Sequence, residues 1–375
     1  MKIGAVFTGG TIGSIVGADG FITVSDACRA QGKDTKEQDA KEIDAKGKDV
    51  KEPNMTGYKL LDLYYSQYDT GHEHDFVIEE PYTILSENLD FTNVKALAEC
   101  VDKMQNTGRI ETENFAGEQG GTKSEQNGAS VNSTSAKESD KLDGIIIMHG
   151  TDTLQYSAGF LHHMLTEKKI PIILVSSAYV LDDPKANGLD NFKLAMDYIE
   201  KCGRPGVYIS YVNSNGRKII HRADMVMAHN AFDSDLCSVC ERYYAEEING
   251  AILINKYWEH DTLRAIPAGE QKCAADFAMK RVAFLHVYPG IELNFDMNSV
   301  DVILIESYHS GTVSVGNRVA ALAQQAGAKG IPVYLVGISS GVSQYETVKV
   351  YEQLGIVPLY DEAPISAYCR LCCGK

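Results

Sequence analysis

Seven short runs of apolar, β-branched residues are spaced along this 375-residue chain, and amphipathic segments lie between several of them. Such runs are typical of strands that helices cover on both faces of a parallel sheet. The alternation of strands and helices predicts an α/β fold. The expected strands are 2–8, 144–149, 172–177, 207–212, 282–287, 302–306 and 333–336, and the expected helices are 153–167, 191–202 and 316–327.

The same pattern suggests how the chain is divided. The stretch 241–280 is polar and irregular and has no clear periodicity, so we place a domain boundary there. The prediction is a larger N-terminal catalytic domain at 1–250, a linker at 251–280 and a smaller C-terminal α/β domain at 281–375. Residues 31–52 and 107–141 contain almost no large apolar side chains, which predicts two disordered surface insertions.

The charge of the chain excludes some classes of partner. Its formal net charge is −16, so nucleic acid and anionic membranes would repel it, and neither is expected as a partner. The first apolar run is too short for a signal peptide, and no run approaches the roughly 18 apolar residues of a membrane helix. We therefore expect a soluble, cytoplasmic protein.

Nine cysteines raise the question of a metal site. Cys237 and Cys240 have a local spacing seen in zinc sites, and so do Cys369, Cys372 and Cys373. The two groups lie far apart in the sequence and bring no nearby histidine ligand. Reduced, partly buried thiols are the alternative, and we predict no metal.

The first expected strand ends in Thr8-Gly9-Gly10-Thr11. Ligands of open α/β sheets bind at the carboxyl ends of strands, and paired glycines let the backbone turn sharply and approach a substrate. Thr11 would then present a hydroxyl to the cleft. A turn that only caps a helix is the alternative. The glycine order departs from the G-x-G-x-x-G pattern of dinucleotide sites.

A second polar cluster follows the expected strand at 144–149. It reads His149-Gly150-Thr151-Asp152-Thr153, and it adds a second hydroxyl with a carboxylate beside it. Helix capping by Thr151 or Asp152 is the alternative, and capping would not exclude chemistry.

Together the two motifs resemble those of the bacterial-type L-asparaginase family, and the resemblance covers most of the chain outside the polar insertions. Residues 84–89 resemble the loop that grips the α-carboxylate of the substrate. Residues 187–192 resemble the family's Asp-Gly-x-x-Asn-Leu, with Asn187 in place of Asp, and 287–291 resemble the strand that opens its C-terminal domain. The resemblance implies a two-domain asparaginase-like fold of the cytoplasmic type.

It also implies a two-step hydrolysis of the L-asparagine side-chain amide, with L-glutamine left open as a second substrate. No cofactor is implied, and the assembly would be a homodimer or a homotetramer, with residues 310–312 completing a neighbour's site. A threonine hydroxyl would attack the amide, helped by other groups because it is a poor nucleophile alone. Backbone N–H groups near Gly10, Thr11 and Thr151 would hold the oxyanion. The implied catalytic residues are Thr11, Thr151 and Asp152, and the substrate-binding residues are Gly10, Ser86, Glu87 and Ser177.

Two departures from the family pattern bear on activity. The family places a tyrosine about ten residues after the first-motif threonine, whereas this chain has Phe21. The family also has a relay lysine shortly before a segment that resembles residues 231–234. Lys218 lies too early for that role, and Arg222 stays protonated and cannot act as a base.

These departures keep two other functions open. One is an asparaginase-like protein with weakened catalysis that binds an amino acid as a sensor or regulator. The other is an amidase component of an amidotransferase that acts on misacylated transfer RNA, which the acidic balance disfavours. Ammonia release from asparagine separates the hydrolase from the sensor.

Overall fold

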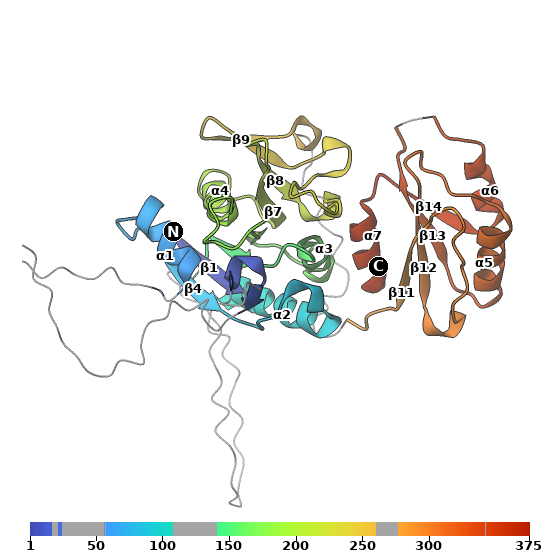
Figure 1. Cartoon of the computed structure of the whole chain (residues 1–375), viewed down its shortest axis with the longest axis horizontal. Helices are drawn as coiled ribbons and strands as arrows, with labels where there is room; N and C mark the ends of the chain where they lie inside the picture. Colours follow the sequence, from blue (N-terminus) through green and yellow to red (C-terminus); the bar gives the residue numbers. More distant parts are fainter. Residues whose placement is uncertain (17–21, 25–55, 57, 108–140, 260–276, 342) are drawn as a thin grey trace, which may run out of the picture.

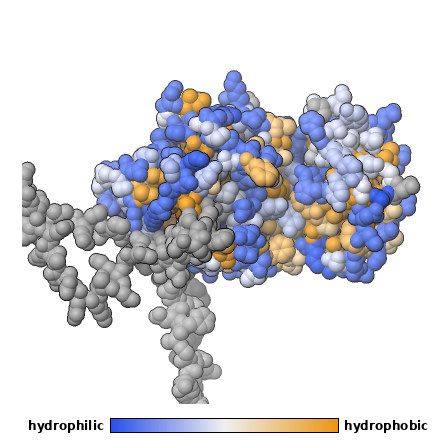
Figure 2. Space-filling model, in the orientation of Figure 1, coloured by the Kyte–Doolittle hydropathy of each residue, from blue (hydrophilic) through white to orange (hydrophobic). Residues whose placement is uncertain are grey.

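The computed structural model describes residues 1–16, 22–24, 56, 58–107, 141–259, 277–341 and 343–375 (Figure 1). Phe21 and nearly all of the two expected insertions lie outside these ranges. Within them, no helix combines the length and apolarity that crossing a membrane requires. The face seen in Figure 2 is mostly hydrophilic, with apolar residues in smaller patches.

The first sheet has eight strands in the order β10-β9-β8-β7-β6-β5-β1-β4. The strands from β7 to β4 in that order run parallel, and β8, β9 and β10 extend the sheet antiparallel. A separate two-stranded ribbon pairs β2 with β3. The bounds are β1 Lys2–Phe7, β2 Ser14–Val16, β3 Ile22–Val24, β4 Asp75–Glu79, β5 Gly144–Met148, β6 Pro171–Val175, β7 Gly206–Val212, β8 Lys218–Arg222, β9 Ala245–Ile248 and β10 Ala251–Ile254.

Helices cover both faces of this sheet. Alternate residues of a strand point to opposite faces, so Val6 joins the core beneath α2 and α3, while Ala5 and Phe7 join the core beneath α1 and α4. Both faces of β5 and β6 are fully buried, as their apolar sequences predict. The helices are α1 Lys59–Tyr68, α2 Phe91–Thr107, α3 Leu154–Met164 and α4 Gly188–Lys201.

The second sheet is smaller and entirely parallel, in the order β11-β12-β13-β14. Two helices, α5 and α6, cover one face, and the last helix, α7, packs on the other. The bounds are β11 Val282–His286, β12 Val302–Glu306, β13 Val333–Ile338, β14 Ile356–Tyr360, α5 Asn317–Ala328, α6 Thr347–Gln353 and α7 Pro364–Cys372.

Helix α7 lies between the two sheets and belongs to both cores (Figure 1). Ala367 and Leu371 face the second sheet, whereas Ile365 and Cys369 join the core of the first. Its approach to α3 is close, since a Cβ added at Gly159 would lie 2.9 Å from the Cys369 sulfur. The cysteines of α7 are therefore buried packing residues.

The structure confirms the α/β class and all seven expected strands to within two residues. The stretch 241–280 was expected to be irregular, but part of it forms an antiparallel hairpin of β9 and β10. That hairpin carries the first sheet as far as Ile254, beyond the expected end of the N-terminal domain at residue 250. The expected domain bounds themselves stay a prediction.

Asn191 holds together the ends of the two strands that lie beside the expected site. Its side chain donates to the Ser176 carbonyl at 2.8 Å and accepts from the Val212 N–H at 2.7 Å, and it is fully buried. These two bonds connect the carboxyl ends of β6 and β7.

Replacing Asn191 with alanine should lower the free energy of unfolding by about 2–4 kcal/mol, because it leaves two backbone groups unpaired in a buried place. Denaturant unfolding followed by circular dichroism measures the change. Glu200→Ala on the exposed side of the same helix is the control and should stay within about 0.5 kcal/mol of the parent. A loss below about 1 kcal/mol for Asn191→Ala would contradict this account.

Candidate active site

Four parallel neighbours, β4, β1, β5 and β6, end at the same edge of the first sheet. The chain after each of them carries residues that the sequence singled out. Thr8 to Thr11 follow β1, Ser86 lies beyond β4, and the His149-to-Thr153 cluster follows β5. Segments more than sixty residues apart in the sequence are thereby brought to one place, as expected for strand ends of an open α/β sheet.

The glycine pair after β1 makes the closest backbone approach of the site. Gly9 and Gly10 have φ of 92° and 76°, and Gly10 N–H donates to the Ile84 carbonyl at 3.0 Å. A Cβ at Gly10 would lie 2.1 Å from the Cα of Gly150, and one at Gly150 would lie 2.5 Å from the Ser86 side chain. Gly10 meets Gly150 backbone to backbone, and the Ser86 side chain lies against Gly150, so neither glycine position has room for a Cβ.

Thr11 directly follows this contact. It begins the 3-10 turn η1 (Thr11–Gly13), in which Gly13 N–H and the Ser14 hydroxyl both donate to the Gly10 carbonyl. The backbone at Thr11 is therefore held against the ends of β1 and β5.

The hydroxyls after β5 connect this segment to its neighbours. Thr151 Oγ1 donates to the Ser177 carbonyl at 2.9 Å, and Thr153 Oγ1 donates to the Ser86 carbonyl at 2.9 Å. Thr153 occupies the N-cap position of α3, and its side chain makes no capping bond there. The carboxylate of Asp152 is exposed and receives a long contact of 3.4 Å from the Ser86 hydroxyl. Because the Thr151 hydroxyl acts as a donor, the lone pairs of its oxygen stay available as acceptors.

His149 stands beside these groups, yet its ring is fixed in a structural role. Its Nδ1 lies 2.8 Å from the Gly150 carbonyl, which only accepts, so Nδ1 carries the proton. Nε2 then accepts from the Ser157 hydroxyl at 2.8 Å. Burial lowers the pKa of His149 to about 4, so the ring is neutral near pH 7 and its lone pair is occupied.

The other expected binding residues differ in exposure. Glu87 is exposed in the short turn η3 (Ser86–Asn88). Ser177 is fully buried, and its hydroxyl donates to the Tyr179 carbonyl at 2.5 Å, so it contributes its backbone carbonyl to Thr151.

Both cations considered for the relay position point elsewhere. Lys218 Nζ lies 2.6 Å from Glu247 on the neighbouring strand β9, and this bond raises the pKa of the lysine. Arg222 pairs with Asp224 at 2.8 Å, and its guanidinium stacks 4.3 Å from the Trp258 ring centre.

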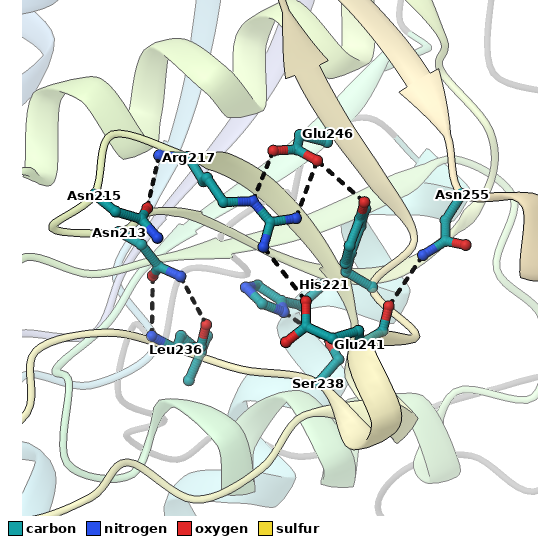
Figure 3. A network of polar contacts seen from close by, with 10 residues as sticks. Asn213, Asn215, Arg217, His221, Leu236, Ser238, Glu241, Glu246 and Asn255 are labelled. Atoms are coloured by element: carbon teal, nitrogen blue, oxygen red, sulfur yellow. Dashed lines mark hydrogen bonds and ion pairs between the residues drawn. The ribbon is translucent and has the colours of Figure 1, made fainter.

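Two histidines with buried ring nitrogens escaped the sequence analysis. His221 lies on β8 and is 1% exposed, and His229 follows in the loop at 226–238. A single histidine in an apolar strand gives no signal in one sequence, because buried histidines are common in cores. The fold places His221 Nδ1 at hydrogen-bond distance from the Ser238 hydroxyl (Figure 3) and packs the His229 ring against Tyr211.

Comparisons with known proteins agree with this geometry. Residues 93–257 match the family model described as Asparaginase, N-terminal. The L-asparaginase of Thermococcus kodakarensis is 35% identical over 74 residues, which make up 20% of this chain and 22% of that protein. Over residues 93–257 the chain is thus similar to the asparaginase N-terminal domain. A component of the glutamyl-tRNA(Gln) amidotransferase of T. kodakarensis is 25% identical over 248 residues, 61% of this chain and 53% of that protein.

The matched segments thus span between about a fifth and a half of these curated relatives. Solved structures align over the whole chain. The thermostable L-asparaginase from T. kodakarensis has a TM-score of 0.66 at 17% identity, covering 100% of this chain and 92% of that one. L-asparaginase I from Vibrio cholerae has a TM-score of 0.63 at 18% identity, covering 99% and 91%. Both likenesses concern the fold, and they confirm the two-domain asparaginase-like architecture.

Gly10→Ala should disrupt the strand-end contact. We expect a loss of about 2–5 kcal/mol in unfolding free energy, from backbone strain at positive φ and from the clash with Gly150, together with loss of ligand binding. Gly216→Ala is the matched control, because its φ is 80° and nothing lies within 4 Å of the added Cβ. Thermal unfolding of both variants measures the difference. Equal losses would show that strain alone acts and that the two backbones are not in contact.

Lys218→Met should leave kcat unchanged. The Lys218 side chain is 45% exposed and paired on the sheet with Glu247, so we expect at most about 1 kcal/mol of destabilisation. Steady-state ammonia release measures kcat for both forms. A collapse of kcat with substrate binding intact would mean that Lys218 reaches the site after all.

Proposed function

We propose that the chain is an amidohydrolase of the asparaginase type, which hydrolyses the side-chain amide of L-asparagine to L-aspartate and ammonia. One observation carries the proposal. The Gly9-Gly10 turn, the Ser86 turn and the Thr151-Asp152 segment converge on one backbone contact at the edge of a parallel sheet. Convergence of hydroxyl and carboxylate groups at such an edge suits acyl transfer.

In this mechanism the Thr11 hydroxyl oxygen bonds to the amide carbon. The carbon–nitrogen bond then breaks, ammonia leaves, and water releases aspartate from the acyl-enzyme. Gly10 N–H is already bonded to the Ile84 carbonyl. The N–H groups of Thr11 and Thr151 are therefore the candidates for stabilising the oxyanion.

The ends of the amino acid would bind around Ser86. The exposed carboxylate of Asp152 suits the α-amino group, and the Ser86 hydroxyl beside it suits the α-carboxylate. Glu87, exposed in the same turn, would assist with the amino group. This arrangement selects a free amino acid by its two charged ends and leaves the choice between asparagine and glutamine to the length of the cleft.

The threonines provide the test. Thr11→Ala and Thr151→Ala should each lower kcat for ammonia release roughly 10³-fold or more while the protein stays folded, and the double variant should be little worse. Thr151→Ala should also lose about 1 kcal/mol of unfolding free energy, because the Ser177 carbonyl loses its donor. Thr92→Ala, an exposed threonine on α2, is the control and should retain full activity. Asparagine and glutamine are assayed side by side. Near wild-type kcat in either single variant would overturn the assigned roles.

Amidotransferase chemistry is a second candidate, favoured by the similarity over 248 residues to an amidotransferase component. In that function the amidase would serve misacylated transfer RNA together with a partner protein. The net charge of −16 opposes binding of RNA by this chain alone. Ammonia release from free asparagine without RNA or partner would favour the hydrolase, whereas release that requires both would favour the amidotransferase.

Cytoplasmic location and assembly as a homodimer or homotetramer are further parts of the proposal. A solved neighbour from Campylobacter jejuni, with a TM-score of 0.60 at 16% identity, carries the name "Probable Cytoplasmic L-asparaginase". Light scattering of the purified chain gives the assembly directly. Binding of asparagine without turnover would instead favour an amino-acid sensor.

A further inference from the structure

The direction of the Thr151 hydroxyl matters for the proposed hydrolysis. A hydroxyl has one proton to donate and two lone pairs that accept. Thr151 Oγ1 donates its proton to the Ser177 carbonyl at 2.9 Å, so the direction of that carbonyl decides where the lone pairs lie. The Ser177 hydroxyl is engaged elsewhere, because it donates to the Tyr179 carbonyl. The groups that hold the peptide between Ser177 and Ala178 therefore control the Thr151 hydroxyl.

Asn187 makes a hydrogen bond to this same peptide. Its Oδ1 accepts from the Ala178 N–H at 2.9 Å. The Ala178 N–H and the Ser177 carbonyl belong to one planar unit, so they point in opposite directions and turn together. A continuous series of hydrogen bonds thus runs from the Asn187 amide through the peptide to Thr151. Each bond in such a series strengthens the next, because a peptide whose N–H is engaged has a stronger carbonyl acceptor.

The other end of the Asn187 amide is anchored on the neighbouring strand. Its Nδ2 donates at 3.0 Å to the carbonyl of Val212, the last residue of β7. Asn187 occupies the N-cap position of α4, yet its side chain makes no capping bond there. The amide therefore spans two strand ends. This fixes its orientation, since exchange of its oxygen and nitrogen would set acceptor against acceptor and donor against donor.

The chain around Ser177 is held from α4 at two further points. Asn191, one turn further along the helix, donates to the Ser176 carbonyl at 2.8 Å. Gly188 lets the start of the helix approach closely, because a Cβ there would lie 2.9 Å from the Ser177 Cβ. These contacts place the segment as a whole, whereas the bond from Asn187 bears directly on the peptide whose carbonyl faces the threonine.

We propose that Asn187 is a positioning residue of the active site, which sets the direction of the Thr151 hydroxyl through the peptide between Ser177 and Ala178. The inference rests on the proposed amide hydrolysis. While the Ser177 carbonyl holds the hydroxyl proton, the lone pairs of Thr151 are turned away from that carbonyl and are free for the reaction. Without the Asn187 amide the peptide can rotate, and the hydroxyl then loses its fixed direction.

An aspartate at position 187, the residue that the family resemblance places there, would supply only one of the two bonds. A carboxylate can accept from the Ala178 N–H, but it has no proton to donate to the Val212 carbonyl. The bond that orients the peptide would be kept, and the bond that anchors the side chain on β7 would be lost. Substitutions at this position can therefore separate an effect on catalysis from an effect on stability.

The test compares Asn187→Ala and Asn187→Asp by steady-state ammonia release and thermal unfolding. Asn187→Ala should lower kcat roughly 10–100-fold with KM nearly unchanged, because a reacting hydroxyl is misdirected while the groups that bind the ends of the amino acid stay in place. Asn187→Asp should keep most of the wild-type kcat, because the Ala178 N–H keeps its acceptor. Both variants should lower Tm, because the Val212 carbonyl loses its donor in each. A merely structural role would lower kcat in both variants alike.

Asn213 provides the matched control. Its amide also accepts from one backbone N–H and donates to one carbonyl, both of Leu236 and both at 3.0 Å (Figure 3). It is half-buried like Asn187, and it holds the loop at 226–238. Asn213→Ala and Asn213→Asp should lower Tm and leave kcat unchanged. A loss of kcat in Asn213→Ala as large as that in Asn187→Ala would show general loosening and would contradict the positioning role.

A second measurement needs no turnover. Tm is compared for Asn187→Ala, Thr151→Ala and their double variant, and a parallel cycle uses Asn213→Ala in place of Asn187→Ala. Side chains joined through one peptide are coupled, so the first double variant should lose less than the sum of its single losses, whereas the second should be additive.

The outcomes for this inference and for the proposed function are distinct. If the wild type turns over, then additive losses in both cycles, or wild-type kcat in Asn187→Ala, would overturn this inference alone. Equal loss of kcat in Asn187→Asp and Asn187→Ala would do the same. If the wild type releases no ammonia from either amide, the proposed function is overturned, and the role of Asn187 in catalysis falls with it.

Discussion

Contact between the backbones of Gly10 and Gly150 is the constraint on which the rest of the site depends. The two glycines lie at the ends of the neighbouring strands β1 and β5, and any Cβ there would have to push the strands apart. Their contact leaves room for the Ser86 side chain and sets Thr11 and Thr151 at the same edge. Side chains as short as serine and threonine can then lie close together, because the backbone segments that carry them are already in contact.

Much of this architecture could be predicted because buried parallel strands are almost uniformly apolar, and β5 and β6 read unambiguously for that reason. The β9–β10 hairpin was missed because each strand has only four residues and β9 carries two consecutive glutamates, which break the apolar pattern. A local signal was present, however. Asn249 and Gly250 both have positive φ in a two-residue connection, and Asn-Gly favours such a turn. Helix α7 was missed because its cysteines drew attention as possible metal ligands and obscured its helical pattern.

The candidate site, like the fold, could be predicted from the sequence only in part. Thr11 and Asp152 could be proposed from the sequence because they follow predicted strands, whose ends share an edge. Ser86 came only from the family resemblance, because β4 was not predicted. Hydrogen-bond direction could not be foreseen, so the Ser177 hydroxyl was expected at the substrate although it is satisfied by Tyr179. The course of the loop at 226–238 could not be foreseen either, because it depends on Asn213, which clamps Leu236 from more than twenty residues away in the sequence.

The ion pairs of Lys218 and Arg222 explain why neither cation serves the site as it stands. Lys218 is paired with Glu247 on the neighbouring strand, and Arg222 is paired with Asp224 beside the Trp258 ring. Moving either side chain into a buried site would strip it of hydration and would leave a carboxylate without its cation. Asp152 is exposed, so its charge is solvated by water and does not require either of them as a partner.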